Sequence, residues 1–255
     1  MKKLILLFLC LPLLVMAAPK VKISKFIIAH RGAWKKQGLP ENSIASLKEA
    51  IKLGCYGAEF DVHMTADSVL VINHDHEFLG MPIETSTYQQ LLAKKHTNGE
   101  TIPTLEAYLK EGIKQKKTKL ILEIKASEIS NERSITMTQK VMQMVKDLKA
   151  EKWMEYLSFD DAICKEMMRV GNKAKVSYLN GEKSPQELKS EGYLGLDYHY
   201  SVFEKHPEWI EEAKDLGLKS NSWTVNDLKV SSALLKNKVD FITTNEPEML
   251  LELEK

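Results

Sequence analysis

Short β-rich runs alternate with longer helical patterns along most of this chain, and this alternation limits its fold more than any other feature. The expected strands are Phe26–His30, Gly57–Val62, Val69–His74, Lys119–Lys125, Tyr156–Phe159, Lys175–Leu179, Gly195–Tyr198, Lys219–Thr224 and Asp240–Thr243. The expected helices are Ser43–Leu53, Ile135–Leu148, Ala162–Val170, Pro185–Glu191, Pro207–Leu216 and Asp227–Leu235. Strand–helix alternation of this kind predicts a parallel sheet with helices packed against it.

Nine strands are one more than a (β/α)₈ barrel contains. Only a few residues separate the strand that ends at Val62 from the strand that begins at Val69. Parallel neighbours need a crossover of about a dozen or more residues, so these two strands can pair only antiparallel. The second is then the return arm of a hairpin, and the other eight predict an α/β fold of the (β/α)₈ TIM-barrel type. The polar segment 76–103 matches no strand–helix unit and is interpreted as a small insertion after this hairpin.

The N-terminus has the features of a secretory signal. Lys2 and Lys3 precede the apolar run Leu4–Ala18, which ends in small residues and is shorter than the roughly 20 residues needed to span a bilayer. We expect residues 1–18 to be a cleaved signal peptide of a secreted or periplasmic protein. A retained N-terminal anchor is the alternative. Since no linker or repeat divides the rest, residues 19–255 are expected to form a single domain.

The charge balance argues against a polyanionic partner. The chain has 36 Lys and Arg against 35 Asp and Glu, and removing Lys2 and Lys3 leaves 34 against 35, or −1. Nucleic-acid binding needs a clustered cationic excess, so we expect no nucleic-acid partner, and no stable membrane insertion once the signal is cleaved. Cys55 and Cys164 are interpreted as buried thiols.

The second expected strand places two carboxylates on one face. Residues two apart on a strand share a face, so Glu59 and Asp61 point the same way and Phe60 points to the other side. Two inward carboxylates in a barrel repel each other unless a cation lies between them. An oxygen-only pair favours Mg²⁺ or Ca²⁺ over zinc. The alternative is a solvated edge strand of alternating polarity.

The strand that ends at Lys125 repeats this arrangement. Glu123 and Lys125 share a face at its C-terminal end, after a hydrophobic run. Glu123 is a candidate third carboxylate for the metal, and Lys125 is a candidate cation for an anionic ligand. A buried ion pair between the two is the alternative.

Two histidines are candidates for proton transfer. His30 and Arg31 directly follow the first strand, and such positions face the catalytic mouth of a barrel. An imidazole moves protons near neutral pH, and a guanidinium binds anions through two hydrogen bonds, although His30 alone could equally be structural. A hairpin turn at residues 66–68 places Asp61 opposite Asn73 and returns His74 to the level of the carboxylates. We prefer His74 to His76 for the catalytic role.

This set of groups suits a phosphate ester. A hard cation with Arg31 and Lys125 stabilises the charge that grows on the non-bridging oxygens, and two histidines can act as general base and general acid. His63 continues the face of Glu59 and Asp61, and it either lines the site or is exposed on the strand. His96, His199 and His206 are interpreted as surface or loop residues.

These motifs, in this order, resemble the glycerophosphodiester phosphodiesterases. The matching segments span nearly the whole chain after the signal: His30-Arg31-Gly32, Pro40-Glu41-Asn42-Ser43, Glu59-Phe60-Asp61-Val62, Thr65-Ala66-Asp67, His74-Asp75, Ile102-Pro103-Thr104-Leu105, Glu123-Ile124-Lys125, Trp223-Thr224-Val225-Asn226 and Thr243-Thr244-Asn245-Glu246-Pro247. One position departs from the family pattern, because Ser68 stands where the turn usually has a glycine with positive φ.

The resemblance implies a metal-dependent barrel enzyme that releases sn-glycerol 3-phosphate and an alcohol from deacylated phospholipids. Glu59, Asp61 and Glu123 would bind the metal, His30 and His74 would form the acid/base pair, and water or the substrate's 2-hydroxyl would attack. Arg31 and Lys125 would hold the phosphate. Trp223 would form an apolar wall for the glycerol or pack the barrel.

Two other functions fit the same fold. The first is a phospholipase that acts on intact lipids, which would need an apolar surface near the mouth, where residues 76–103 offer little beyond Phe78, Leu79 and Met81. The second is a catalytically silent, phosphate-binding barrel. Silent relatives would be expected to lose a histidine or a carboxylate, and this chain keeps all five.

Overall fold

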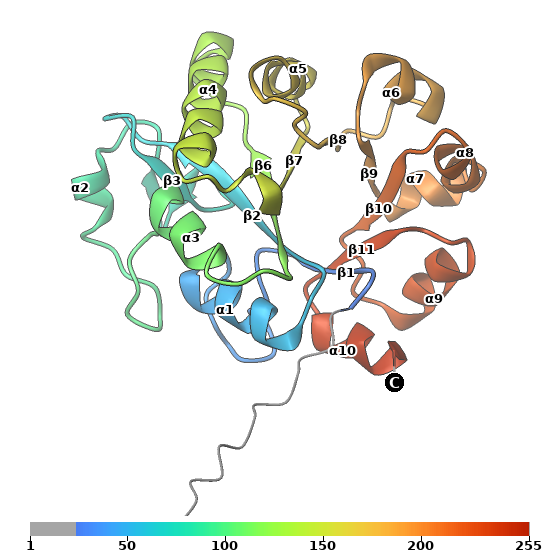
Figure 1. Cartoon of the computed structure of the whole chain (residues 1–255). Coiled ribbons are helices and arrows are strands. Elements are labelled where there is room, and N and C mark those ends of the chain that lie inside the picture. The colour runs from blue at the N-terminus through green and yellow to red at the C-terminus, as the bar shows by residue number, and fades with distance from the viewer. Residues whose placement is uncertain (1–23, 255) are drawn as a thin grey trace, which may run out of the picture.

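Eight parallel strands close into a barrel in the computed structural model, which describes residues 24–254 (Figure 1). The strand β1 pairs with both β2 and β11, and this pairing closes the sheet. The TIM-barrel prediction is therefore confirmed, whereas the expected signal peptide lies outside the described residues. In chain order, the barrel strands are β1 (Ile27–Ala29), β2 (Gly57–Met64), β6 (Lys119–Ile124), β7 (Met154–Ser158), β8 (Val176–Tyr178), β9 (Gly195–His199), β10 (Lys219–Trp223) and β11 (Phe241–Thr244).

The helices surround the barrel, as Figure 1 shows. The longer ones are α1 (Ile44–Leu53), α3 (Leu105–Gly112), α4 (Asn131–Asp147), α5 (Asp161–Val170) and α9 (Leu228–Lys236). The shorter ones are α6 (Pro185–Glu191), α7 (Tyr200–Lys205), α8 (Trp209–Asp215) and α10 (Pro247–Leu251), with 3₁₀ turns at Glu151–Trp153 and Glu252–Glu254. Within residues 24–254, no helix combines the length and apolar character needed to cross a membrane.

The start predicted for α4 was wrong. It begins at Asn131 rather than Ile135, because the Ser130 side chain caps it by accepting a hydrogen bond from the backbone N–H of Arg133 at 3.2 Å. Outside the segment 76–103, the helices α3, α7 and α10 were missed altogether. Each has eight residues or fewer, a length at which the helical period is weak, although α6 and α8, with seven residues each, were predicted.

The main core lies between the barrel and its helices. Alternate residues of β2 supply it, and the Phe60 ring packs on Tyr108 of α3 with ring centroids 4.3 Å apart. All eight residues of β2 are buried, so the solvated edge strand is ruled out. A second apolar layer, formed by Ile28, Ile121, Leu157 and Leu179, fills the barrel interior below the site. Cys55 and Cys164 are both buried, as expected.

The hairpin has the register expected from the sequence. The strand β3 (Leu70–Ile72) pairs antiparallel with β2, with Val62 opposite Ile72. The backbone N–H of Asn73 donates to the carbonyl of Asp61 at 3.1 Å, so this pairing continues to the level where His74 was placed. Ser68 has a φ of 64°, and it therefore adopts the left-handed conformation usually given to glycine in this turn.

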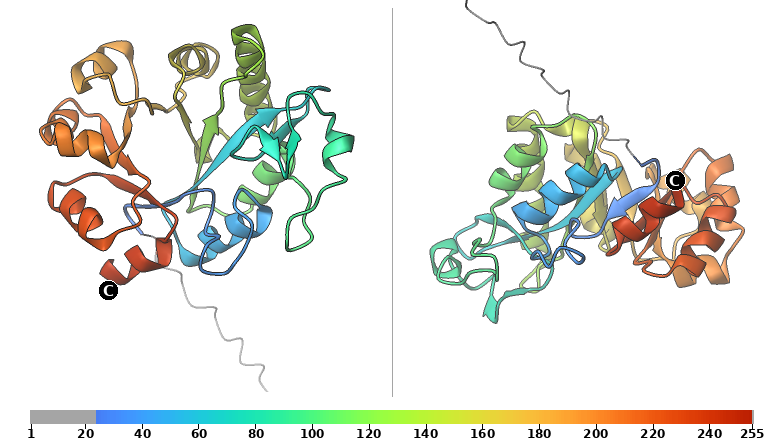
Figure 2. Two further views of the ribbon diagram at one scale, coloured as in Figure 1. Left: turned by 180° about the vertical axis from the view of Figure 1, so that it is seen from behind. Right: turned by 90° about the horizontal axis from the view of Figure 1, so that it is seen from below.

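The segment 76–103 forms a small unit beside β2 and β3 (Figure 2). It contains a short hairpin of β4 (Glu77–Phe78) and β5 (Met81–Pro82), followed by α2 (Tyr88–Leu91). A separate small core, formed by Val71, Phe78, Ile83, Leu91 and Ile102, holds it together. Glu84 fastens it to the barrel by an ion pair with Arg133, whose Nε lies 3.2 Å from the carboxylate.

Candidate active site

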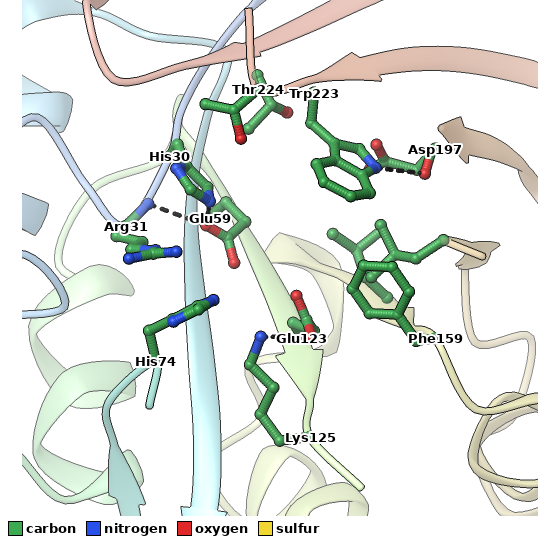
Figure 3. A pocket seen from close by; sticks show the side chains of 13 residues that line it. His30, Arg31, Glu59, His74, Glu123, Lys125, Phe159, Asp197, Trp223 and Thr224 are labelled. Atoms are coloured by element: carbon green, nitrogen blue, oxygen red, sulfur yellow. Dashed lines mark hydrogen bonds and ion pairs between the residues drawn. The ribbon is translucent and has the colours of Figure 1, made fainter. Parts of the chain in front are cut away.

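A cavity opens at the C-terminal ends of the barrel strands (Figure 3). Its empty volume, counting the space at the open mouth, is about 490 Å³. Seven of the eight residues expected at the site line it: His30, Arg31, Glu59, His74, Glu123, Lys125 and Trp223. The eighth, Asp61, is almost fully buried and is held by side chains around this cavity. The structure therefore brings together residues separated by nearly 200 positions in the sequence.

Three carboxylates lie together on the inner faces of β2 and β6. Ligand oxygens of Glu59, Asp61 and Glu123 all lie within 4.8 Å of one another. Burial, reinforced by the charge of Asp61, raises the pKa of Glu59 well above its ordinary value and that of Glu123 to about 7. Burial opposes the ionisation of Asp61 too, but Lys125 and the other favourable partners of Asp61 lower its pKa below the usual range. Keeping all three carboxylates ionised without a cation beside them would therefore be energetically unfavourable.

The carboxylate cluster fits a hard divalent cation. Oε2 of Glu59 accepts the backbone N–H of Arg31 at 2.9 Å, whereas Oε1 is buried and has no hydrogen-bond partner among residues 24–254. An unpaired buried oxygen is costly, and the neighbouring ligand atoms are all carboxylate oxygens. Mg²⁺ and Ca²⁺ prefer such donors, so the residues present fit either ion.

Lys125 is bound to the carboxylates in this structure. Its Nζ lies 2.9 Å from Oδ1 of Asp61 and 2.7 Å from Oε1 of Glu123, so the buried ion pair foreseen as an alternative is present. Burial lowers the pKa of Lys125, but these two carboxylates raise it more, and the net shift is upward. On the other side of Asp61, the Asn42 amide donates to Oδ2 at 2.8 Å and accepts the backbone N–H of Asp61 at 3.1 Å. Asp61 is therefore fixed from two directions.

A tight turn after β1 places Arg31 at the cavity. Arg31 has a φ of 55° and Gly32 a φ of 79°. A Cβ on Gly32 would lie 2.4 Å from Oγ of Ser46, so only glycine fits between this turn and α1. The guanidinium donates from NH1 to Glu41 at 2.8 Å, while its buried Nε has no partner in the described part of the chain. Arg31 lines the cavity and keeps N–H donors beyond the one bonded to Glu41.

His30 is held with one ring nitrogen toward the carboxylates. Its Nδ1–H donates to Oδ1 of Asn245 at 2.7 Å, and this bond leaves Nε2 without a proton in the neutral ring. Nε2 lies 3.9 Å from Oε2 of Glu59. Burial, together with the Arg31 guanidinium, lowers the pKa of His30 to about 4. His30 is therefore neutral at pH 7 and offers a lone pair at Nε2.

His74 enters the same cavity from the segment after β3. Its Nδ1–H donates to Oδ1 of Asp75 at 2.7 Å, and this hydrogen bond lowers the pKa of Asp75. Figure 3 shows His74 and His30 directed into one space from different elements. His76 instead lies beside Glu128, with 3.7 Å between Nδ1 and the carboxylate. This placement supports the preference for His74.

His63 is buried and does not occupy an exposed strand position. Its Nε2–H donates to the backbone carbonyl of His74 at 3.1 Å, and its ring meets His76 edge to face with centroids 5.0 Å apart. Burial lowers the pKa of His63 to about 4, so the ring is neutral. His63 therefore acts on the backbone that carries His74 rather than on the cavity itself.

Replacing His63 with leucine is expected to lower kcat about tenfold with little change in KM, because it displaces His74, the histidine expected from the sequence to transfer a proton. His63→Gln, whose amide can donate to the same carbonyl, should recover most of the loss. Steady-state kinetics tests this expectation, with His206→Ala as the control. Equal activity of His63→Leu and the wild type would contradict it.

An apolar wall faces the charged side of the cavity. Trp223 lines it at the end of β10 and donates from Nε1 to the backbone carbonyl of Asp197 at 2.8 Å. Phe159 meets Trp223 edge to face at 5.5 Å between centroids. His199 lies 5.3 Å from Trp223 at the end of β9 and is half-buried, so its interpretation as a surface or loop residue was wrong.

The model of the glycerophosphoryl diester phosphodiesterase family matches residues 30–249 of this chain. The chain belongs to this family. A glycerophosphodiester phosphodiesterase from Caldanaerobacter subterraneus subsp. tengcongensis is 28% identical, over 89% of this chain and 96% of that protein. Since its relatives are hydrolases of this class, the chain is a phosphodiesterase of the family.

Solved structures of the family have the same fold. One from Parabacteroides distasonis has a TM-score of 0.87 and 47% identity, over 89% of this chain and 95% of that one. A phosphodiesterase from Oleispira antarctica, solved with the product sn-glycerol-3-phosphate, has a TM-score of 0.76 and 22% identity, over 90% and 97% of the two chains.

Several residues that shape this phosphodiesterase site were missed as individual functional residues. Asn42 and Asn245 lie within segments that carry the family resemblance, so their positions were visible but their contacts were not. Asp197 had a signal of its own, because it is a carboxylate within an otherwise apolar strand. Phe159 had none, since an aromatic residue at a strand end usually indicates core.

Proposed function

We propose that this phosphodiesterase hydrolyses glycerophosphodiesters, the deacylated forms of phospholipids, to sn-glycerol 3-phosphate and an alcohol with the help of a divalent cation. The observation that carries the proposal is the meeting of two histidines, three carboxylates and two cationic side chains at one barrel mouth. The product named in the Oleispira antarctica structure supports the choice of substrate class.

Arg31 and Lys125 would bind the phosphate. Both are paired with carboxylates in this structure, Arg31 with Glu41 and Lys125 with Glu123 and Asp61. A phosphodiester anion can pair with the guanidinium of Arg31, which lines the cavity and has N–H donors beyond the one bonded to Glu41. Lys125 has three donors, so it can reach a phosphate oxygen while keeping its carboxylate partners.

The two histidines would move the protons. The attacking oxygen, from water or from the substrate's own 2-hydroxyl, gives its proton to Nε2 of His30, whose Nδ1–H is fixed by Asn245. The departing alkoxide takes a proton from Nε2 of His74, whose ring is oriented by the hydrogen bond from Nδ1–H to Asp75. With water as the attacker, one imidazole ends protonated and the other neutral, and exchange with solvent restores both. With the 2-hydroxyl as the attacker, a cyclic phosphate forms, and water opens it in a second step in which His74 takes the proton of the water and His30 returns its proton to the departing 2-oxygen.

Glu59, Asp61 and Glu123 would hold Mg²⁺ or Ca²⁺. When bound, such an ion stabilises negative charge on the phosphate oxygens as a Lewis acid. The chain's own contribution is to hold the carboxylates so that they converge, through Asn42 on Asp61 and the backbone of Arg31 on Glu59.

A phospholipase acting on intact lipids is less favoured. Of the three apolar residues available in the insertion, Phe78 is buried in its small core and only Leu79 is largely exposed, at 51%. The insertion therefore offers a bilayer little apolar surface.

Assay of the purified chain lacking residues 1–18 tests the proposal. Glycerophosphocholine and glycerophosphoethanolamine should both release glycerol 3-phosphate, EDTA should remove the activity, and added Mg²⁺ or Ca²⁺ should restore it. Full turnover in EDTA would refute the metal dependence. Turnover of intact phospholipid but not of the deacylated substrates would instead establish the phospholipase.

We also propose that the protein is secreted or periplasmic, on the basis of its N-terminal sequence. Fractionation of producing cells should find the protein outside the cytoplasm, and N-terminal sequencing should find a chain that starts at Ala18 or Pro19. A cytoplasmic chain that still starts at Met1 would refute this proposal.

A further inference from the structure

A second hollow lies at the end of the barrel opposite to the active site. It is lined by residues within 142–156 and 170–175, which belong to α4, α5, the start of β7 and the loops between them, and we call it the basal groove. Its empty volume, counting the space at its open side, is about 1120 Å³. Figure 1 shows α4 and α5 side by side on the outside of the barrel. The basal groove and the active-site cavity share no lining residue.

Apolar side chains form much of the wall of the basal groove. Met142 and Val145 of α4 line it together with Met154 of β7, and Val170 at the end of α5 is 38% exposed beside them. A hydrocarbon chain that covers such a surface removes it from water and gains free energy. An extended peptide fits less well, because its backbone N–H and C=O groups need partners that these side chains do not offer.

Four lysines give the basal groove a positive charge. Lys146, Lys152, Lys173 and Lys175 all line it and are exposed, and none of them forms an ion pair within residues 24–254. Glu151 is the one carboxylate among the lining residues. Only Lys146 lies in the last turn of an α-helix, so compensation of helix dipoles does not account for the other three lysines. The groove therefore suits an anion.

Tyr156 adds a hydrogen-bond donor inside the basal groove. The residue lines the groove and is only 3% exposed. Its hydroxyl forms no hydrogen bond with another residue in the described part of the chain, yet it is not one of the fully enclosed polar atoms, so a ligand can reach it. Burial raises the pKa of Tyr156, and the hydroxyl therefore keeps its proton at neutral pH. A buried tyrosine hydroxyl usually has a partner, and here a ligand can supply the acceptor.

We propose that the basal groove binds a fatty acid. The hydrocarbon chain would cover the apolar wall, while the carboxylate accepts the Tyr156 O–H and lies among the lysines. A carboxylate suits this set better than a phosphate, because no arginine lines the groove to bind phosphate oxygens in pairs. The hydrolysis that deacylates a phospholipid also releases fatty acids. This last link rests on the proposed function, whereas the binding itself does not.

Isothermal titration calorimetry of the enzyme with decanoate tests the proposal. We expect one decanoate per chain, with acetate and decanol each binding at least about tenfold more weakly, because the first lacks the chain and the second lacks the charge. Decanol or acetate binding as tightly as decanoate would overturn the proposal. Tighter binding of decyl phosphate would overturn the choice of a fatty acid. Sedimentation with phosphatidylglycerol vesicles, in the absence of decanoate binding, would instead identify a membrane-docking surface.

Variants show whether decanoate occupies the basal groove. Tyr156→Phe removes only the hydroxyl and is expected to weaken decanoate binding about tenfold. The double variant Lys173→Glu/Lys175→Glu should bind no measurable decanoate. The matched control is Lys94→Glu/Lys95→Glu, which changes the net charge equally at two exposed lysines of the insertion and should bind like the wild type.

Unchanged decanoate binding in both groove variants would place the ligand elsewhere and overturn the proposal. Thermal denaturation checks that the variants are folded, and if the double lysine variant is not, Tyr156→Phe decides alone. None of the substituted residues lines the active site, so all variants should hydrolyse glycerophosphocholine like the wild type. If the wild type binds decanoate in the groove but hydrolyses no glycerophosphodiester, the proposed function fails and the fatty-acid site stands.

Discussion

Replacing His30 with alanine is expected to lower kcat for glycerophosphodiester hydrolysis by about two to four orders of magnitude. The imidazole is neutral, and Asn245 holds Nδ1–H so that Nε2 presents its lone pair at the carboxylate cluster. Alanine removes the only group proposed to take the proton of the attacking oxygen. Binding of the phosphate depends on Arg31 and Lys125, so KM should change far less. Steady-state kinetics with glycerophosphocholine measures both constants.

The matched control for this variant is His206→Ala. His206 lies at the end of α7 with its side chain 45% exposed, and it does not line the cavity, so its replacement should leave kcat unchanged. Thermal denaturation should give both variants a melting temperature close to that of the wild type. A kcat for His30→Ala within threefold of the wild type would show that another group is the base.

The barrel could be predicted because each of its strands has a recognisable pattern of apolar residues in the sequence. Parallel barrel strands are buried on both faces, and here they appear as short apolar runs at regular intervals. The hairpin between β2 and β3 was predictable from loop length alone, since no parallel crossover fits between Val62 and Val69. Its register followed from the same short turn, and the pairing of Val62 with Ile72 confirms it.

Three of the short helices, α3, α7 and α10, could not be predicted with the same argument. Their helical state comes from docking on the barrel rather than from a long amphipathic period, as in α7 with six residues and α10 with five. The four-residue error at the start of α4 arose because Ser130 caps the helix before its apolar pattern begins.

The part of the candidate site that lies on a single strand could be predicted from the sequence. The two-residue period places Glu59 and Asp61 on one face without any tertiary information. The partners that fix protonation states come from distant segments, as Asn245 does for His30 across 215 positions. A pattern of neighbouring residues cannot reveal two partners so far apart in the sequence. For the same reason, the sequence could not decide whether Lys125 faces an anionic ligand or its neighbouring carboxylates.

Replacing Lys125 with methionine is expected to destabilise the metal-free protein by about 3–5 kcal/mol, because it leaves buried carboxylates without their cation. Nζ lies within 2.9 Å of both Asp61 and Glu123, and the side chain is only 13% exposed. Urea denaturation in EDTA measures the loss. The exposed pair of Lys110 and Glu106 provides the control, since Lys110→Met should cost at most about 0.5 kcal/mol. An equal effect of both substitutions would contradict the prediction.

The dependence of this loss on pH and metal identifies its electrostatic origin. Without Lys125, the native pKa of Glu123, already about 7, rises further above its unfolded value. A native carboxyl that holds its proton longer than the unfolded one makes stability fall as pH rises, so the deficit of Lys125→Met should be larger at pH 8 than at pH 5. Saturating Mg²⁺ or Ca²⁺ should recover part of it at pH 8, because the ion replaces the missing cation between the same oxygens. If the loss of stability in Lys125→Met depended on neither pH nor metal, it would instead indicate lost packing of the lysine's aliphatic chain.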